Sequence, residues 1–413
     1  MHILVPDAQS FHGGVETVTT RVINAWTHNF KTKVTWVLPP HRLERFRSEF
    51  KGNPALEFES FQWSRTHPRT LFLSLLKRSH SILSKAWELQ CNNARLRKII
   101  LKQNCTHCFY FWPIKEPFPH LKIPVFCLIC DLAWQRVAES YPHDNPEDLD
   151  NALRNWVLRC RQVFTISGST RNEVVDLTSE MADKVHDVLL AADRPFVEST
   201  KNGPDFSFID EKVPFFLYPS APNPQKNHLV LFQAVSTLLE RGLCFRLVLT
   251  GGHTSRLLGD VPMDRRLPER ARRFFQERKK ELSSVIVAVD DVPEEALSHL
   301  YNSCLAVLMP SQYEGFGLAV AEAFTHGKPV IASDLPVFRE QIDCYRAKDF
   351  VETFPATSHL GLADLMETRL REGPLSAESS QALRNKTRRW KWNDVAKTYI
   401  QVMQGSDARE EVA

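Results

Sequence analysis

The stretch Ser311-Gln-Tyr-Glu-Gly-Phe-Gly-Leu-Ala-Val-Ala-Glu-Ala-Phe-Thr-His-Gly-Lys-Pro-Val-Ile-Ala-Ser333 decides the fold of this chain. The apolar run 304–309 before it predicts a strand, residues 317–326 predict a helix, and residues 329–332 predict a second strand. The helix is apolar on nearly every side, which indicates that it is buried. Strand, helix and strand in this order are typical of a parallel sheet with crossover helices.

Two glutamates, Glu314 and Glu322, mark this stretch as a candidate site. Glu322 lies on the apolar helix, where a carboxylate is costly unless a hydrogen bond satisfies it. Because no neighbouring Lys or Arg can serve as a local partner, we expect a ligand hydroxyl to bind it. Residues 315–317, Gly-Phe-Gly, leave backbone N–H groups open at the helix N-terminus, where phosphate binds well. A glycine-rich turn that can bind phosphate, next to a buried carboxylate that can bind the hydroxyls of a polyol, predicts a nucleotide-sugar site.

The spacing of Glu314 and Glu322 resembles the E-x7-E signature of retaining glycosyltransferases of family 4, which have the GT-B fold. The alternative, a structural helix with a solvated Glu at its edge, is disfavoured by the matching residues on both sides. The resemblance covers most of the chain and implies two Rossmann-like domains facing across a cleft. It places Glu314 beside the donor hexose and Glu322 on the nucleotide ribose. It places the donor diphosphate at the backbone of Gly315, Phe316, Gly317 and Leu318.

Strand-like and helix-like segments alternate along the chain, which predicts an α/β architecture with parallel sheets. The polar stretch 199–213 has little periodicity and predicts a linker. We therefore expect an N-terminal, acceptor-side domain over residues 1–205 and a C-terminal, donor-binding domain over residues 206–389. The resemblance implies that a last helix within residues 390–413 crosses back onto the N-terminal domain. The predicted strands are 3–5, 33–38, 107–111, 125–129, 162–166, 214–218, 245–250 and 284–289.

The composition limits the classes of function. A length of 413 residues suffices for two large domains, and a formal net charge of +3 is too small to indicate a nucleic-acid partner. Residues 1–7 predict a first strand, not a signal peptide. No stretch reaches the roughly 18 apolar residues of a membrane span. Nine cysteines, an odd number scattered through apolar segments, favour a reducing compartment, so we expect a cytoplasmic protein.

Four of the cysteines leave two interpretations open. The pairs Cys105-x2-Cys108 and Cys127-x2-Cys130 are separated by 18 residues, a spacing typical of a zinc ribbon. Both pairs lie in apolar, strand-like runs, where residues three apart point to opposite faces. The pattern therefore favours core cysteines over zinc ligands. The dipeptide 290–291, Asp-Asp, likewise predicts a turn rather than a metal site, and we expect neither a metal nor a cofactor.

Glycines and a lysine at other strand ends extend the candidate site. Gly13 and Gly14 follow the first predicted strand, and the resemblance implies that they face the donor diphosphate and the acceptor. A plain strand-to-helix turn is the alternative. Gly251 and Gly252 end a strand of the second domain, at the edge where open α/β sheets bind ligands. The resemblance gives Lys226 a catalytic role on the diphosphate, and the alternative is a surface lysine at a helix start.

Two positions depart from the family pattern. The resemblance implies an Arg five residues before Lys226, where this chain has Ala221, and a donor-contacting His where it has Cys130. A single Lys can still neutralise the charge of a leaving group. Asp131, the next residue after Cys130, is a further candidate catalytic residue, and a capping role at the strand end is an equal alternative.

Residues 65–102 carry nine Lys or Arg and one acidic residue, Glu88, among interleaved apolar side chains. A basic amphipathic helix is typical of proteins that bind an anionic membrane surface. Many relatives in the resembled family act on lipid-linked acceptors, which would give such a helix a purpose. The alternative is a solvated helix face.

Together these features predict a retaining, metal-independent glycosyltransferase at the cytoplasmic face of the membrane. It would move a hexose from a nucleotide diphosphate sugar to a glycan or lipid-linked acceptor, in the synthesis of a bacterial surface polysaccharide such as lipopolysaccharide. The resemblance implies front-face attack, with the departing phosphate taking the acceptor proton, so no carboxylate base is needed. One rival is another enzyme of the same fold, a nucleotide-sugar epimerase or a phosphorylase. A second rival is an inactive partner subunit, which Ala221 and Cys130 favour.

Overall fold

The computed structural model describes residues 1–7, 13–61, 80–141, 144–192, 213–259, 267–290 and 292–408. The chain divides into two compact units. The first comprises Met1–Cys130, Glu147–Leu189 and Trp392–Ala413, and the second comprises Asp131–Pro146 and Leu190–Lys391. The predicted linker and the predicted boundary between residues 205 and 206 fall almost wholly within residues 193–212, outside the described residues.

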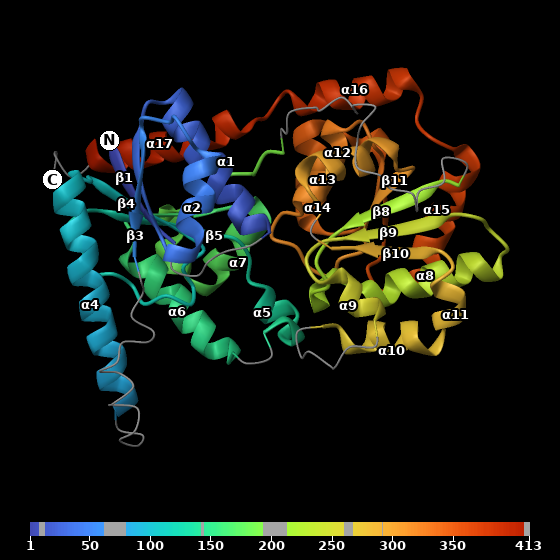
Figure 1. Cartoon of the computed structure of the whole chain (residues 1–413), viewed down its shortest axis with the longest axis horizontal. Coiled ribbons are helices and arrows are strands. Elements are labelled where there is room, and N and C mark those ends of the chain that lie inside the picture. Colours follow the sequence, from blue (N-terminus) through green and yellow to red (C-terminus); the bar gives the residue numbers. More distant parts are fainter. Residues whose placement is uncertain are drawn as a thin grey trace. The chain divides into compact units, whose positions relative to one another are not determined.

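The first unit is built on a seven-stranded parallel sheet with the order β3-β2-β1-β4-β5-β6-β7 (Figure 1). Such an order, which starts in the middle of the sheet and adds strands to each side in turn, is that of a doubly wound fold. The strands are β1 (His2–Pro6), β2 (Lys33–Leu38), β3 (Leu56–Ser60), β4 (His107–Phe111), β5 (Val125–Ile129), β6 (Gln162–Thr165) and β7 (Val185–Asp187). The helices include α1 (Gly14–Asn29), α2 (Pro40–Glu49), α4 (His80–Gln103), α6 (Pro146–Arg159), α7 (Gly168–Leu177) and α17 (Trp392–Ala408).

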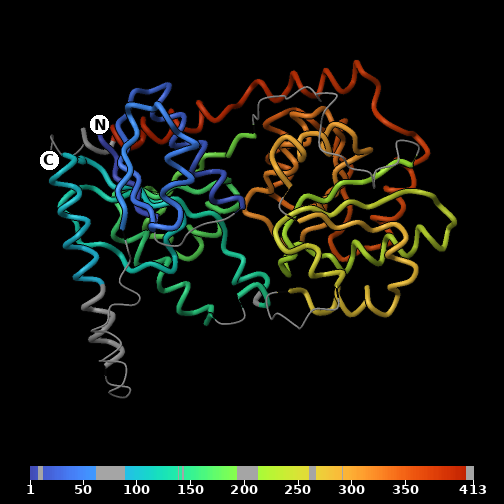
Figure 2. The backbone as a smooth tube through the Cα atoms, viewed as in Figure 1, coloured from blue at the N-terminus to red at the C-terminus, as the bar shows by residue number. Residues whose placement is uncertain are grey.

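The C-terminal helix α17 completes the core of the first unit. Trp26 of α1 donates a hydrogen bond from Nε1 to the carbonyl oxygen of Ala396, at 3.2 Å. The ring of Tyr399 lies 4.7 Å from that of Phe164 and 5.7 Å from that of Phe109, between centroids. Figure 2 shows the end of the chain running beside α1. Because aromatic side chains bury large apolar areas, these contacts hold α17 on the sheet.

The four cysteines of the two Cys-x2-Cys motifs are buried thiols. Cys105, Cys108, Cys127 and Cys130 are all buried and none forms a disulfide. Cys108 and Cys127 lie on the adjacent strands β4 and β5. Burial raises the pKa of the Cys105 thiol to about 11, whereas a zinc ligand has to be a thiolate. Within the described ranges, no three His, Cys, Asp or Glu side chains come together as a metal site.

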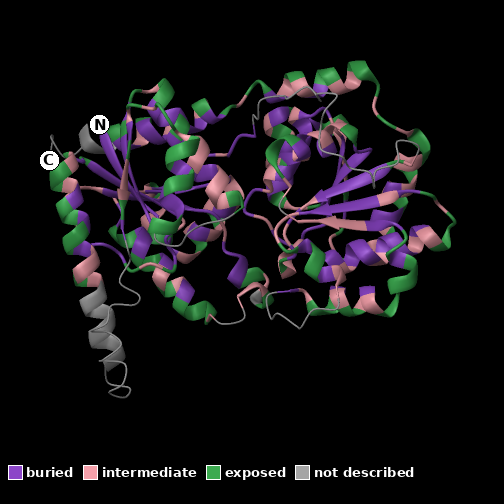
Figure 3. Ribbon diagram, in the orientation of Figure 1, coloured by how far each residue is buried: buried purple, intermediate pink, exposed green. Residues whose placement is uncertain are grey.

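The second unit repeats the same topology with six parallel strands in the order β10-β9-β8-β11-β12-β13. Figure 3 shows its central strands buried beneath the surrounding helices. The strands are β8 (Phe215–Pro219), β9 (Arg246–Thr250), β10 (Ile286–Val289), β11 (Ala306–Met309), β12 (Val330–Ser333) and β13 (Val351–Phe354). The helices are α5 (Ala133–Arg136), α8 (His228–Glu240), α9 (Thr254–Leu258), α10 (Glu269–Glu277), α11 (Lys279–Leu282), α12 (Glu294–Ser303), α13 (Leu318–Thr325), α14 (Pro336–Tyr345), α15 (His359–Glu372) and α16 (Ala377–Thr387).

The basic stretch 65–102 is described only in part. Residues 62–79 lie outside the described residues, and so do the side chains of α4 before Leu89. In the described turns Leu96 and Ile99 are buried, so their apolar face packs within the first unit. The basic side chains on these turns are exposed; they are Arg95, Arg97, Lys98 and Lys102. None of the helices in the described ranges is both long and apolar enough to cross a membrane.

Candidate functional site

The candidate site is built around the turn between β11 and α13. The predicted strand 304–309, helix 317–326 and strand 329–332 correspond to β11, α13 and β12, with ends shifted by one or two residues. Gly317 precedes α13 with a φ of +82°. A Cβ atom there would lie 2.6 Å from Cε1 of Phe338. Only glycine meets both demands without strain, so the chain enters α13 through a turn that has no room for a side chain.

Lys226 and Glu314 meet at the centre of this site. The Lys226 ammonium lies 2.7 Å from Oε1 and 2.9 Å from Oε2 of Glu314, and the Ser311 hydroxyl donates to Oε1 at 2.7 Å. Lys226 ends the short 3-10 helix η3 (Pro224–Lys226) after β8, and Glu314 follows β11, the neighbouring strand. The family resemblance gave each residue a separate part of the donor. The structure adds that, in the protein itself, they form an ion pair with each other.

Asn227 ties the lysine segment to the glutamate turn. It has a left-handed conformation, with φ of +60°, at the start of α8. Its side-chain amide donates to the carbonyl oxygens of Pro310 and Ala356, both at 2.8 Å. The sequence analysis gave Asn227 no role. Asn is one of the few residues besides glycine that adopt a left-handed conformation. An Asn directly before a predicted helix was therefore the signal that the sequence offered.

Glu322 has a protein partner that the sequence analysis did not identify. The Tyr301 hydroxyl of α12 donates to Oε2 of Glu322 at 2.8 Å, and both residues are buried. Glu322 therefore has a hydrogen bond within the protein itself, and the binding of a ligand hydroxyl to it stays a prediction. The His326 ring stacks on the Tyr301 ring with centroids 4.9 Å apart and nearly parallel planes. Tyrosine and carboxylate come from different helices, so no local pattern indicated the pair.

We expect Tyr301→Phe to lower the free energy of unfolding by about 1.5 kcal/mol, because it removes a buried hydrogen bond to a charged group. Urea denaturation followed by circular dichroism measures the change. Tyr399→Phe is the matched control, since Tyr399 is also fully buried but its hydroxyl has no hydrogen-bond partner within the described ranges. That control should leave stability unchanged or slightly higher. Equal losses of unfolding free energy in both variants would contradict a stabilising hydrogen bond from Tyr301 to Glu322.

Gly251 brings the end of β9 against the end of β8. Its φ is +141°, and a Cβ atom at this position would lie 2.7 Å from the backbone nitrogen of Ala221. Gly252 follows in the same turn. The close approach at Gly251 is thus made to the backbone of Ala221, the position at which the resembled family has an arginine.

Asp131 lies in the segment Asp131–Pro146 of the second unit. Its Oδ1 accepts a hydrogen bond from the N–H of Ala133 at 3.0 Å, which is the capping arrangement that the sequence left open. The backbone N–H of Leu132, the residue after Asp131, donates to the Tyr313 hydroxyl at 2.7 Å. Asp131 is therefore placed near the Glu314 turn through a neighbouring backbone contact. Cys130, the preceding residue, is buried.

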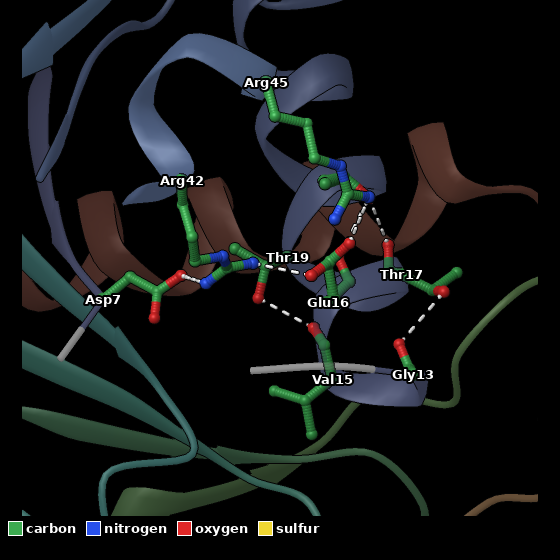
Figure 4. A network of polar contacts seen from close by, with 9 residues as sticks. Asp7, Gly13, Val15, Glu16, Thr17, Thr19, Arg42 and Arg45 are labelled. Carbon is green, nitrogen blue, oxygen red and sulfur yellow. Dashed lines mark hydrogen bonds and ion pairs between the residues drawn. The ribbon is translucent and has the colours of Figure 1, made fainter. Parts of the chain in front are cut away.

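Gly13 and Gly14 belong to the first unit. Gly13 has a φ of +66° just before α1, whose first residue is Gly14, and residues 8–12 lie outside the described residues. Figure 4 shows the ion-pair network that fixes this end of α1. The Arg42 guanidinium lies 2.6 Å from both Asp7 and Glu16. The network holds the strand-to-helix turn in place and keeps the carboxylates of Asp7 and Glu16 paired.

Two further groups set the electrostatics of the second unit. Burial, and then the positive charge of Lys226, lower the pKa of His228 to about 3, so its ring is neutral. Burial raises the pKa of Asp290, but hydrogen bonds from Ser255 and Thr254 outweigh this and hold it below its usual range. Asp290 thus caps the turn leading into α9, while Asp291 lies outside the described residues.

Solved structures with this architecture are glycosyltransferases and related enzymes of the GT-B fold. A sucrose-phosphate synthase from Thermosynechococcus elongatus aligns over 99% of both chains with a TM-score of 0.73 at 15% identity. WaaG, a glycosyltransferase involved in lipopolysaccharide biosynthesis, aligns over 98% of this chain and all of its own, with a TM-score of 0.62 at 13% identity. The chain has the GT-B fold, with two Rossmann-like domains.

Residues 200–390 match the model of the family described as glycosyl transferases group 1. The O-antigen chain mannosyltransferase B of Escherichia coli is 26% identical over 212 residues, covering 49% of this chain and 51% of the relative. The O-antigen chain mannosyltransferase RfbU of Salmonella typhimurium is 26% identical over 188 residues, covering 46% of each. The chain spans about half the length of the curated relatives it matches.

Proposed function

We propose that the protein is a retaining, metal-independent glycosyltransferase. It moves a hexose from a nucleotide diphosphate sugar to a glycan or lipid-linked acceptor, in bacterial surface polysaccharide synthesis. The observation that carries the proposal is the ion pair of Lys226 and Glu314 beside the open turn before α13. Cation, carboxylate and helix N-terminus lie at the carboxyl ends of adjacent parallel strands, where α/β sheets bind ligands.

Each group has a proposed task on the donor. Lys226 and the N–H groups of residues 315–318 stabilise the departing diphosphate, because fixed positive charge in a partly buried site offsets the negative charge that develops there. Glu322 binds the ribose, held in its rotamer by Tyr301. Glu314 binds the hexose. The departing phosphate takes the acceptor proton during front-face attack, so the mechanism needs no separate base and no metal.

The descriptions of similar proteins support a proposal for the donor and the acceptor. Two similar proteins are described as O-antigen chain mannosyltransferases, which favours mannose as the transferred hexose. A UDP-glucose complex of the structurally similar Anabaena HepE, at 14% identity and a TM-score of 0.64, fits the use of a nucleotide sugar donor. We propose that the acceptor is a lipid-linked glycan and that the basic stretch 65–102 meets an anionic membrane surface on the cytoplasmic side.

One observation favours a second candidate function, that of an inactive partner subunit. Ala221 supplies no second cation, and the charge of Lys226 is already paired with Glu314. A subunit of this kind would bind a nucleotide weakly and transfer no sugar to any acceptor. An epimerase on the same fold would instead convert the donor without an acceptor.

Thermal unfolding with UDP, GDP, dTDP and ADP tests the donor site. A nucleotide at about 100 times its dissociation constant should stabilise the wild type by roughly 2.7 kcal/mol. We expect one nucleotide to do so, and the stabilisation to be lost in Glu322→Ala. Glu322→Gln serves as the companion variant, because its amide oxygen still accepts from Tyr301 and keeps the helix packed. A wild type that none of the four nucleotides stabilises would argue for the inactive-subunit alternative.

A further inference from the structure

Gln341 of α14 reaches the turn that precedes α13. The residue is 0% exposed. Its side-chain nitrogen donates to the carbonyl oxygen of Phe316 at 2.6 Å and lies 3.5 Å from that of Gly317. We propose that Gln341 is a positioning residue that orients the backbone N–H groups of this turn toward the donor diphosphate. This inference rests on the proposed function.

The peptide geometry gives the direction of the N–H group. In a trans peptide the C=O and N–H bonds point in opposite directions, and the described peptides are all trans. With the Phe316 carbonyl drawn toward the buried Gln341, the N–H of Gly317 points away from it. Gly317 and Leu318 are half-buried, and their N–H groups have no hydrogen-bond partner within the described part of the chain. The turn therefore presents two free donors on its accessible side.

A second side chain of α14 acts on the same turn. Phe338 lies three residues before Gln341, on the same face of the helix. Its ring fills the space that a side chain at position 317 would need. Phe338 thus confines Gly317 by contact, while Gln341 sets the rotation of the peptide by hydrogen bonding. Together they hold the turn ready for an anion, which lowers the ordering cost of binding.

Gln341 is poorly explained by stability alone. Its Oε1 atom is buried and has no hydrogen-bond partner within the described ranges. An unsatisfied buried carbonyl costs free energy. A methionine of similar length would remove this cost but would leave the Phe316 carbonyl without its donor, so the two effects on stability oppose each other. The amide is useful at this position because it donates to the turn.

The test compares diphosphates with nucleosides. Wild type, Gln341→Met and Gln341→Glu are titrated calorimetrically with UDP, GDP, dTDP and ADP and with the four parent nucleosides. We expect Gln341→Met to bind the preferred nucleoside diphosphate about tenfold more weakly, a ratio typical of one well-placed interaction, with the nucleoside affinity unchanged. Gln341→Glu, which replaces the donor by an acceptor facing two carbonyls, should lose at least as much. The thermal midpoint of Gln341→Met should change little, because the lost hydrogen bond to Phe316 is offset by removal of the unsatisfied Oε1 atom.

Three outcomes overturn the inference. If Gln341→Met binds the nucleoside diphosphate as tightly as the wild type does, the amide does not orient the N–H groups. Parallel losses for diphosphate and nucleoside, with a lower thermal midpoint, show that Gln341 only supports the fold. A wild type that binds none of the four diphosphates overturns the proposed function and the inference together, so the two failures are distinguishable.

Discussion

Lys226→Met is expected to lower the free energy of unfolding by about 3 kcal/mol, because it leaves the Glu314 carboxylate without its cation. The side chains of Lys226 and Glu314 are 19% and 8% exposed, so water can replace little of the lost interaction. Methionine keeps the length and the apolar stem of the lysine, so the loss reports the charge. Urea denaturation of the wild type and the variant measures it.

A double-mutant cycle separates the pair from its surroundings. Glu314→Gln alone should cost about 2 kcal/mol, since Lys226 then loses its carboxylate while the amide still accepts from Ser311. Replacing both residues removes both charges, and the double variant should lie within about 1 kcal/mol of the wild type. Simple addition of the two single losses would instead show that the residues do not interact in solution.

An exposed ion pair provides the matched control. Arg339 and Asp334 approach to 2.6 Å, but their side chains are 58% and 43% exposed. Arg339→Met should therefore change stability by no more than about 0.5 kcal/mol, because water screens the pair. A loss at Lys226 no larger than the loss at Arg339 would mean that the central pair contributes no more than a surface contact.

The pairing also bears on catalysis. The Lys226 ammonium is half-buried and is already held by the Glu314 carboxylate before the donor arrives. It therefore does not have to reorganise when the diphosphate departs. Glu314 then has two tasks in the proposed mechanism, to orient Lys226 and to bind the hexose. Loss of sugar transfer in Glu314→Gln would reflect both, whereas Lys226→Met would chiefly weaken diphosphate binding.

The elements of the second unit could be predicted from sequence because apolar runs and turn residues are local signals. The strands predicted at 245–250 and 304–309 correspond to β9 and β11, with bounds that differ by at most two residues. Residues that meet across the sheet carry no such signal. Lys226 and Glu314 are 88 positions apart and touch because β8 and β11 are neighbours in the sheet.

The same limit explains the residues that the sequence analysis missed. Tyr301 reaches Glu322 from another helix, and Gln341 reaches Phe316 across 25 positions. Both are side chains in amphipathic helices, where a buried Tyr or Gln looks like ordinary core from its spacing. The strand order of a doubly wound sheet, applied to the sequence, would have put the segments after the first and fourth strands side by side. It would not have fixed which polar atoms meet.

Gly251→Ala is expected to lower the free energy of unfolding by about 4 kcal/mol or more. Two costs add. The φ of +141° is a conformation that side chains rarely adopt, and the new Cβ would stand 2.7 Å from the Ala221 nitrogen and 2.8 Å from the Ser220 carbonyl carbon. Both neighbours are backbone atoms at the end of β8, so neither can swing aside as a flexible side chain could. Relief requires β8 and β9 to separate at the ends that carry the site.

Gly242→Ala isolates the first of these costs. Gly242 also has a positive φ, +74°, but an added Cβ would meet no atom within 4 Å. Its expected loss is about 1 kcal/mol, that of a left-handed alanine. Urea denaturation of both variants gives the difference due to the close approach at Gly251. If Gly251→Ala yields no folded protein while Gly242→Ala folds, the order of the two losses is the one expected. Equal, small losses would mean that β8 and β9 do not meet as closely as the structure shows, and the turn carrying Ala221 and Lys226 would then have room for a larger side chain.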